Sequence, residues 1–156
     1  DWSSVREDPA EARAALAPAT ILHDAAVTIE GVTIVGSPHV PRAGLPCRTA
    51  FNREPEELVA LFSRLPRCDV LLTHSPPAGH GDLNEWGKPA CACPELSAAI
   101  AAMQPPPRFH CFGHNHTDWG ASRDAATACA SAADASLAGE RALQVAKIAG
   151  DPVARR

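Results

Sequence analysis

The sequence predicts a layered fold of the α/β or α+β class. Across the middle of the 156-residue chain, short apolar runs typical of strands alternate with segments of helical apolar spacing. Strands are expected at residues 25–29, 32–35, 69–73 and 108–112, and helices at 54–64 and 94–103. Because prolines and glycines separate these segments, the pattern favours one domain, or part of one, built on a sheet.

Each of these elements has a local cause. Glu30-Gly31 can turn the chain between two β-branched runs, which makes a hairpin of them. Leu58, Leu61 and Phe62 recur at helical spacing, and Pro94 suits the first position of a helix. A further helix is expected at 10–16 and a last strand at 142–148, within an alanine-rich tail over 125–156.

Two of the expected strands end next to histidine. Val70, Leu71 and Leu72 form an apolar run, as expected of a strand buried on both faces, and His74 follows it. Residues 109–112 form a second buried strand, in which Cys111 acts as a small apolar residue. That strand ends at Gly113, where the backbone can bend without a Cβ clash.

His114 and His116 come directly after this bend. In an extended segment, side chains at i and i+2 point to the same side. The carboxyl ends of strands are also where ligands bind in α/β folds. We therefore expect His74, His114 and His116 to converge as ligands of a divalent metal. The alternative is a polar loop that happens to hold two histidines.

At these residues the chain resembles a known family. Leu72-Thr-His-Ser-Pro-Pro77 followed by Phe112-Gly-His-Asn-His116 resembles the second half of the calcineurin-like metallophosphoesterases. Residues 27–38 and 77–83 are similar to its metallophosphoesterase-domain-containing branch, whose members are phosphodiesterases. The resemblance covers about residues 20–120. It implies a partial metallophosphoesterase domain over 1–124, forming the carboxyl-terminal half of a two-sheet β-sandwich flanked by helices.

The resemblance also implies a mechanism. His74 and His114 would bind one metal, and His116 the other, in a dinuclear centre of manganese, iron or zinc. Two metals about 3.5–4 Å apart neutralise the phosphate and activate a bridging water. The expected substrate is a small phosphodiester, with cyclic nucleotides among the candidates. His80 is a candidate to protonate the leaving group or contact substrate, and a solvated loop histidine is the alternative.

The motifs that the family's first half supplies occur nowhere in the sequence. They are Asp-x-His, Gly-Asp-x-x-Asp and Gly-Asn-His, and they carry the bridging carboxylate. We therefore expect a carboxyl-terminal fragment or a degenerate relative, with little or no phosphodiesterase activity alone.

Two other classes stay open. One is a non-catalytic module that holds at most one metal. The other is a metallo-β-lactamase-like hydrolase, because His114-x-His116-x-Asp118 matches the start of its His-x-His-x-Asp-His motif. In that motif, however, Trp119 stands where the last histidine belongs. Asp118 and Asp124 could instead orient imidazoles, or be ordinary turn aspartates.

Composition narrows the possible partners and location. The net charge is -4 with both signs interspersed, which argues against binding to polymeric nucleic acid or a membrane surface. The sequence has neither an apolar run of transmembrane length nor a visible signal peptide, so we expect a cytoplasmic protein. Cys91-Ala-Cys93 lacks a second cysteine pair, which favours loop thiols over a structural zinc site or a redox pair.

Overall fold

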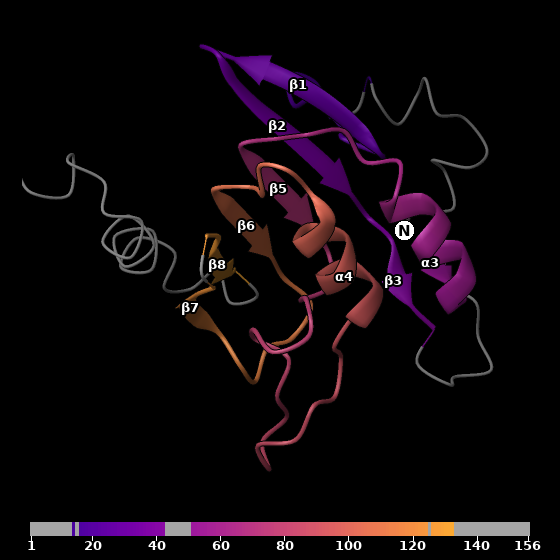
Figure 1. The fold of residues 1–156 in the computed structure, drawn as a ribbon, viewed down its shortest axis with the longest axis vertical. Coiled ribbons are helices and arrows are strands. Elements are labelled where there is room, and N and C mark those ends of the chain that lie inside the picture. The colour runs from indigo at the N-terminus through magenta and orange to yellow at the C-terminus, as the bar shows by residue number, and fades with distance from the viewer. Residues whose placement is uncertain (1–13, 15, 43–50, 125, 133–156) are drawn as a thin grey trace, which may run out of the picture.

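The computed structural model describes residue 14 and residues 16–42, 51–124 and 126–132. Its largest element is a six-stranded sheet in the order β1-β2-β5-β6-β8-β7 (Figure 1). The strands of this sheet are β1 (Ala25–Ile29), β2 (Val32–Ser37), β5 (Val70–Thr73), β6 (Phe109–Phe112), β7 (Gly120–Arg123) and β8 (Ala128–Ser131). The four inner strands run parallel, and the edge strands β1 and β7 run antiparallel to their neighbours.

The remaining described elements are two helices and a small ribbon. Helix α3 spans Pro55–Phe62, and helix α4 spans Pro94–Ala102. Strands β3 (Val40–Pro41) and β4 (Asn52–Arg53) pair as a two-stranded sheet. The predicted mixed α/β architecture is confirmed, with a core that is mostly sheet and few helices. Of the first predicted helix, only Ala14 and Leu16 are among the described residues, and the predicted strand at 142–148 lies outside them.

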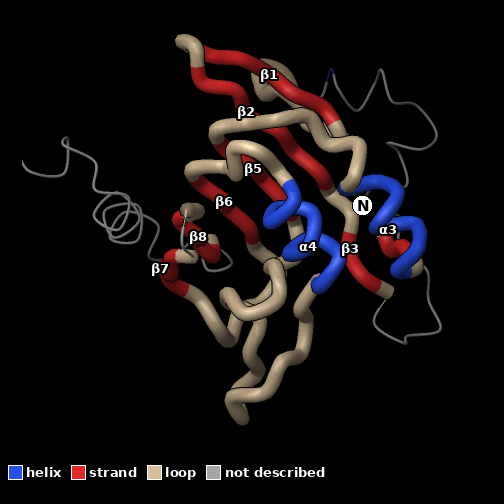
Figure 2. Tube along the Cα trace, in the orientation of Figure 1, coloured by secondary structure: helices blue, strands red, loops and turns tan. Residues whose placement is uncertain are grey.

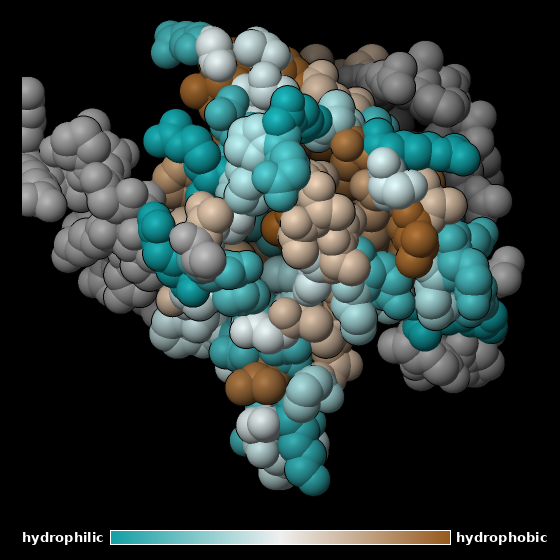
Figure 3. Space-filling view, viewed as in Figure 1, coloured by the Kyte–Doolittle hydropathy of each residue, from teal (hydrophilic) through white to brown (hydrophobic). Residues whose placement is uncertain are grey.

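Both helices lie on one face of the sheet, where they form the hydrophobic core (Figure 2). The sheet contributes Val35 and Leu71 to this core, and the helices contribute Leu58, Phe62, Leu96 and Ile100. Burying each of these side chains stabilises the fold by about 1.5–3 kcal/mol. The outer surface on the helix side mixes hydrophilic and apolar groups, as Figure 3 shows.

The opposite face of the sheet is apolar but only partly covered. Side chains alternate between the two faces of a strand, so the neighbours of Val35 and Leu71 point away from the helices. Leu72 is 37% exposed, and the exposed fractions of Val32 and Ile29 are 39% and 55%. The prediction that β5 is buried on both faces is therefore wrong, because no described helix packs on this second face.

Strand β6 also differs from its prediction. Phe112 is buried as expected, but Phe109 and Cys111 are only partly buried, and His110 is fully buried on the helix face. A polar side chain therefore occupies a position that the pattern assigns to an apolar one.

Strand β8 lies in a segment for which the sequence predicts no element. All four of its residues are buried, and it lies between β6 and β7. Its small side chains carry no alternation of apolar and polar residues, so the pattern gave no signal. Within the described part of the chain, no helix is long and apolar enough to cross a membrane.

Candidate metal centre

The candidate site lies at the edge where the parallel strands end. Ser37 of β2 pairs with Thr73 of β5, and Leu72 of β5 pairs with Cys111 of β6. His74 directly follows β5, and His114 follows β6 by two residues. The predicted convergence of the two strand ends is therefore present in the fold.

The imidazoles of His74 and His114 are in contact. His74 Nε2 lies 3.1 Å from His114 Nδ1, and the rings meet edge-on with centroids 4.9 Å apart. The Gly113 backbone N–H donates to the His74 carbonyl at 3.1 Å, which joins the two loops. The nitrogen separation is close to the ligand spacing of about 3.3 Å expected around a tetrahedral zinc ion.

Both imidazoles favour their neutral form. Burial lowers the pKa of His74, and the pKa of His114 is lowered first by burial and then by His74 and His116. A neutral imidazole has a free lone pair for a metal, whereas a protonated one has none. The pair is therefore chemically suited to bind a cation near neutral pH.

The backbone around His114 is strained. His114 has φ +72°, and the Asn115 N–H donates to the Gly113 carbonyl at 2.9 Å. This is a γ-turn of the rare kind with positive φ. The bend expected at Gly113 thus lies one residue later, on a non-glycine residue, where it costs about 1–3 kcal/mol. Such strain is often found at functional sites.

His116 does not complete a three-ligand group with this pair. The segment is not extended at His114, so the i and i+2 alternation does not bring His114 and His116 to the same side. Among the described residues, no three metal-ligating side chains that include His74 and His114 place ligand atoms within 4.8 Å of one another. The structure therefore brings together two of the three predicted ligands.

His110, a buried histidine that the sequence analysis did not select, contacts Thr73, the residue before His74. His110 Nε2 lies 2.8 Å from Thr73 Oγ1, and that hydroxyl donates to the Ser75 carbonyl at 2.8 Å. The imidazole must then donate its Nε2–H to Thr73. Burial, followed by the nearby His80, lowers the pKa of His110 to about 3. His110 is therefore a neutral support for the end of β5, and its position in an apolar strand was the available signal.

The loops at this edge are locked together by side chains whose role the sequence did not reveal. Asn115 is buried and donates to the carbonyls of Gly81 and Leu83, both at 2.9 Å. Asp118 accepts from the Leu83 N–H at 3.0 Å, a contact that joins two loops and does not orient an imidazole. These bonds hold the loop that carries His114 against the loop that carries His80.

The other predicted candidates occupy the surroundings of the site. His80 Nδ1 lies 2.8 Å from Ser122 Oγ of β7, and its role in catalysis stays a prediction. Cys91 and Cys93 are free thiols. Burial raises the pKa of the Cys93 thiol to about 12, which leaves it without thiolate character.

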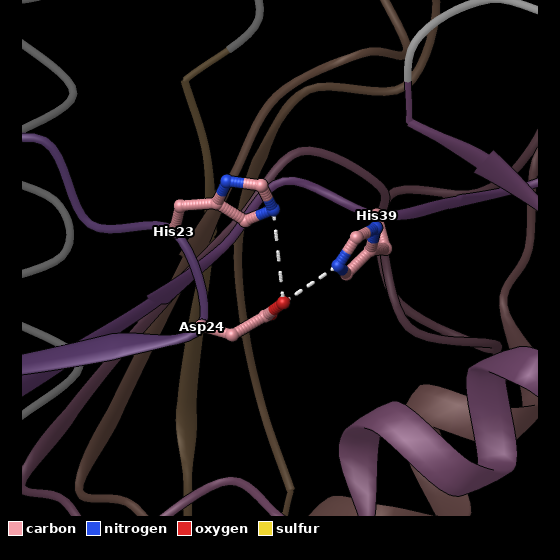
Figure 4. A group of neighbouring side chains, drawn as sticks. All are labelled: His23, Asp24 and His39. Atoms are coloured by element: carbon pink, nitrogen blue, oxygen red, sulfur yellow. Dashed lines mark hydrogen bonds and ion pairs between the residues drawn. The ribbon is translucent and has the colours of Figure 1, made fainter. Parts of the chain in front are cut away.

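A second group of ligand-type side chains lies at the same edge and was not foreseen from the sequence. His23, Asp24 and His39 place one ligand atom each within 4.8 Å of one another (Figure 4). The His-Asp pair just before an expected strand was the only available signal, because His39 is distant in sequence.

Comparisons with known proteins bear on the family. No family model matches the sequence. A UPF0046 protein of Caenorhabditis elegans is 32% identical over 122 residues, which cover 76% of this chain and 42% of that protein. Metallophosphoesterase domain-containing protein 1 of Homo sapiens is 32% identical over 108 residues, which cover 68% of this chain and 32% of that protein. The chain is related to metallophosphoesterase-domain proteins.

The chain spans less than half the length of these two relatives. One solved structure superposes with a TM-score of 0.57 at 15% identity, covering 77% of this chain and 48% of that one. At that identity the likeness supports the fold alone.

Proposed function

We propose that this chain supplies the second half of a dinuclear metallophosphoesterase centre that hydrolyses small phosphodiesters. The observation that carries the proposal is the contact between His74 Nε2 and His114 Nδ1 at 3.1 Å, at the carboxyl ends of two adjacent parallel strands. The sequence similarity to metallophosphoesterase domain-containing protein 1 also supports this proposal. Cyclic nucleotides are candidate substrates, because they are small phosphodiesters.

The donor set fits part of such a centre. Two neutral imidazoles suit manganese, iron or zinc, and His74 and His114 would hold one of these ions. His116 would face the second ion once carboxylate ligands are supplied. The bound metals would contribute charge neutralisation and an activated water. The chain's own histidines would position the ions, and His80 would donate a proton to a leaving group or contact the phosphate.

The partly covered face of the sheet supports the proposal that a further half of the domain packs on it. Its apolar row includes Ile29, Val32 and Leu72, which are between 37% and 55% exposed. Sheets that pack face to face bury such rows between them at a spacing of about 10 Å. We propose that the first half of the domain packs a second sheet here, which would bring its carboxylates to the edge that carries His74.

Complementation tests this function. The chain is co-expressed with the first half of a metallophosphoesterase domain that carries the Asp-x-His, Gly-Asp-x-x-Asp and Gly-Asn-His motifs. Hydrolysis of bis-p-nitrophenyl phosphate is measured with added Mn²⁺. We expect hydrolysis only when both halves are present.

Two variants serve as controls for that experiment. Leu72→Asp places a charge on the partly covered face and is expected to abolish co-purification of the halves. Glu30→Gln, in the exposed β1–β2 turn, is expected to change neither co-purification nor hydrolysis. Robust metal-dependent hydrolysis by the 156 residues alone would contradict the proposal, as would full activity of a His74→Ala/His114→Ala chain.

A further inference from the structure

The group formed by His23, Asp24 and His39 is built by the hairpin and the segment after it. His23 and Asp24 directly precede β1, and His39 lies between β2 and β3. Ala25 pairs with Gly36 in the antiparallel ladder, so the start of β1 lies beside the end of β2. Residues 15 positions apart therefore meet at one point, as Figure 4 shows.

The geometry of the group is close to that of a three-ligand metal site. Asp24 Oδ2 lies 2.7 Å from His39 Nε2 and 3.8 Å from His23 Nε2. The ligand atoms of a tetrahedral zinc ion are about 3.3 Å apart, given bonds of about 2.0–2.1 Å. One observed separation is shorter than this value and the other longer, so small side-chain rotations would admit an ion.

Neighbouring groups hold these ligands in place. Ser37 Oγ donates to Asp24 Oδ1 at 2.7 Å, which leaves Oδ2 directed at the imidazoles. The ring of Phe51 lies edge-on to His23 and His39, with centroids 5.4 and 6.1 Å away. His39 is only 2% exposed, whereas His23 is accessible to solvent. A buried ligand, an oriented carboxylate and an exposed ligand leave an open side for water or another small ligand.

We propose that His23, Asp24 and His39 form a separate binding site for one divalent transition ion, best suited to Zn²⁺. Two imidazoles and one carboxylate form a donor set that zinc prefers, and three protein ligands leave a position for water. This site includes its own carboxylate. It therefore does not depend on the proposed phosphoesterase function or on a first half of the domain.

One feature limits the expected affinity. The Nε2–H of His39 now donates to Asp24, so a metal at Nε2 moves the remaining imidazole proton to Nδ1. That nitrogen is buried and has no hydrogen-bond partner in the described part of the chain. Because metal-bound histidines usually donate this proton to an outer partner, we expect binding about 10- to 100-fold weaker than in a fully supported site.

The test must exclude the His74 site. In the full chain carrying His74→Ala, His114→Ala and His116→Ala, Zn²⁺ binding is measured by calorimetry after chelator treatment. We expect one Zn²⁺ per chain. Adding His23→Ala or Asp24→Asn is expected to weaken binding by roughly 10-fold or more, whereas adding Glu30→Gln leaves it unchanged.

Co²⁺ absorption provides a second readout that identifies the donor atoms. We expect the bands of nitrogen and oxygen coordination without sulfur-to-metal charge transfer, and their loss with His23→Ala. Equal Zn²⁺ binding in the parent, His23→Ala and Asp24→Asn chains would overturn the proposal, as would a thiolate signal. His23 is exposed, so its replacement tests the site without disturbing the core.

Discussion

Two groups of histidines lie along the same edge of the sheet, and they differ in what accompanies the imidazoles. His74 and His114 contact each other with no carboxylate completing a three-ligand group among the described residues. His23 and His39 instead share Asp24, which Ser37 orients. The first pair can hold an ion firmly only with further ligands. The second group contains a complete minimal set, which shows that histidines at a strand end do not by themselves define a self-sufficient site.

The largest expected effect is the loss of phosphodiester hydrolysis when a histidine of the first pair is replaced. In the complemented enzyme, His74→Ala should lower the rate of phosphodiester hydrolysis by at least about 100-fold. Removing a metal ligand should cost more than the 10- to 100-fold lost with an outer-shell partner. The rate is measured at saturating Mn²⁺. A loss smaller than tenfold would remove His74 from the centre.

Acid should reveal the buried histidine that supports the first pair. The unfolded chain protonates His110 near its ordinary pKa of 6.5, whereas burial lowers the folded pKa to about 3. The unfolded state thus binds more protons between these values, so stability is greatest above pH 6.5 and falls as the pH is lowered toward 3. Between pH 7 and pH 4.5 the free energy of unfolding should drop by roughly 2–3 kcal/mol from this group.

Urea unfolding of wild type and His110→Leu at both pH values measures this contribution. The contributions of His74 and His114 are common to both chains and cancel in the comparison. We expect a smaller acid-induced loss in the variant. Equal losses in the two chains would mean that His110 is not held neutral.

Loss of the Asn115 hydrogen bonds that join the two loops should have a smaller effect on stability. Asn115→Ala leaves the carbonyls of Gly81 and Leu83 without their donor, and this should lower the free energy of unfolding by about 1–3 kcal/mol. Asn84→Ala is the matched control, because Asn84 accepts exposed N–H groups of Trp86 and Lys88. If the two variants lose equal stability in chemical denaturation, the Asn115 hydrogen bonds contribute no more stability than those of an exposed turn.

The smallest effect should come from the carboxylate's support in the second group. Ser37→Ala removes the hydroxyl that donates to Asp24 Oδ1, so the carboxylate gains rotational freedom. We expect Zn²⁺ affinity to fall about 10-fold, which corresponds to about 1.4 kcal/mol. Calorimetry in the chain without His74, His114 and His116 measures this. An unchanged affinity would show that Ser37 supports the fold and not the site.

Local pattern was enough to place most elements. The β-branched runs around Glu30-Gly31 form the hairpin, and the spacing of Leu58 and Phe62 forms α3. The histidines at the ends of β5 and β6 were also identified from local pattern, because the end of each apolar run marks the end of a strand. Strand β8 escaped prediction because four small buried residues show no period.

The sequence by itself determined the hairpin, the two helices, strands β5 and β6 with His74 and His114 at their ends, and the relationship to metallophosphoesterase-domain proteins. Only the tertiary structure decided which side chains meet. Strand order brings His39 to Asp24, and the turn at His114 keeps His116 out of a three-ligand group. The physical reason is that local pattern depends on neighbours along the chain, whereas ligand convergence depends on strand register and loop conformation, which packing fixes.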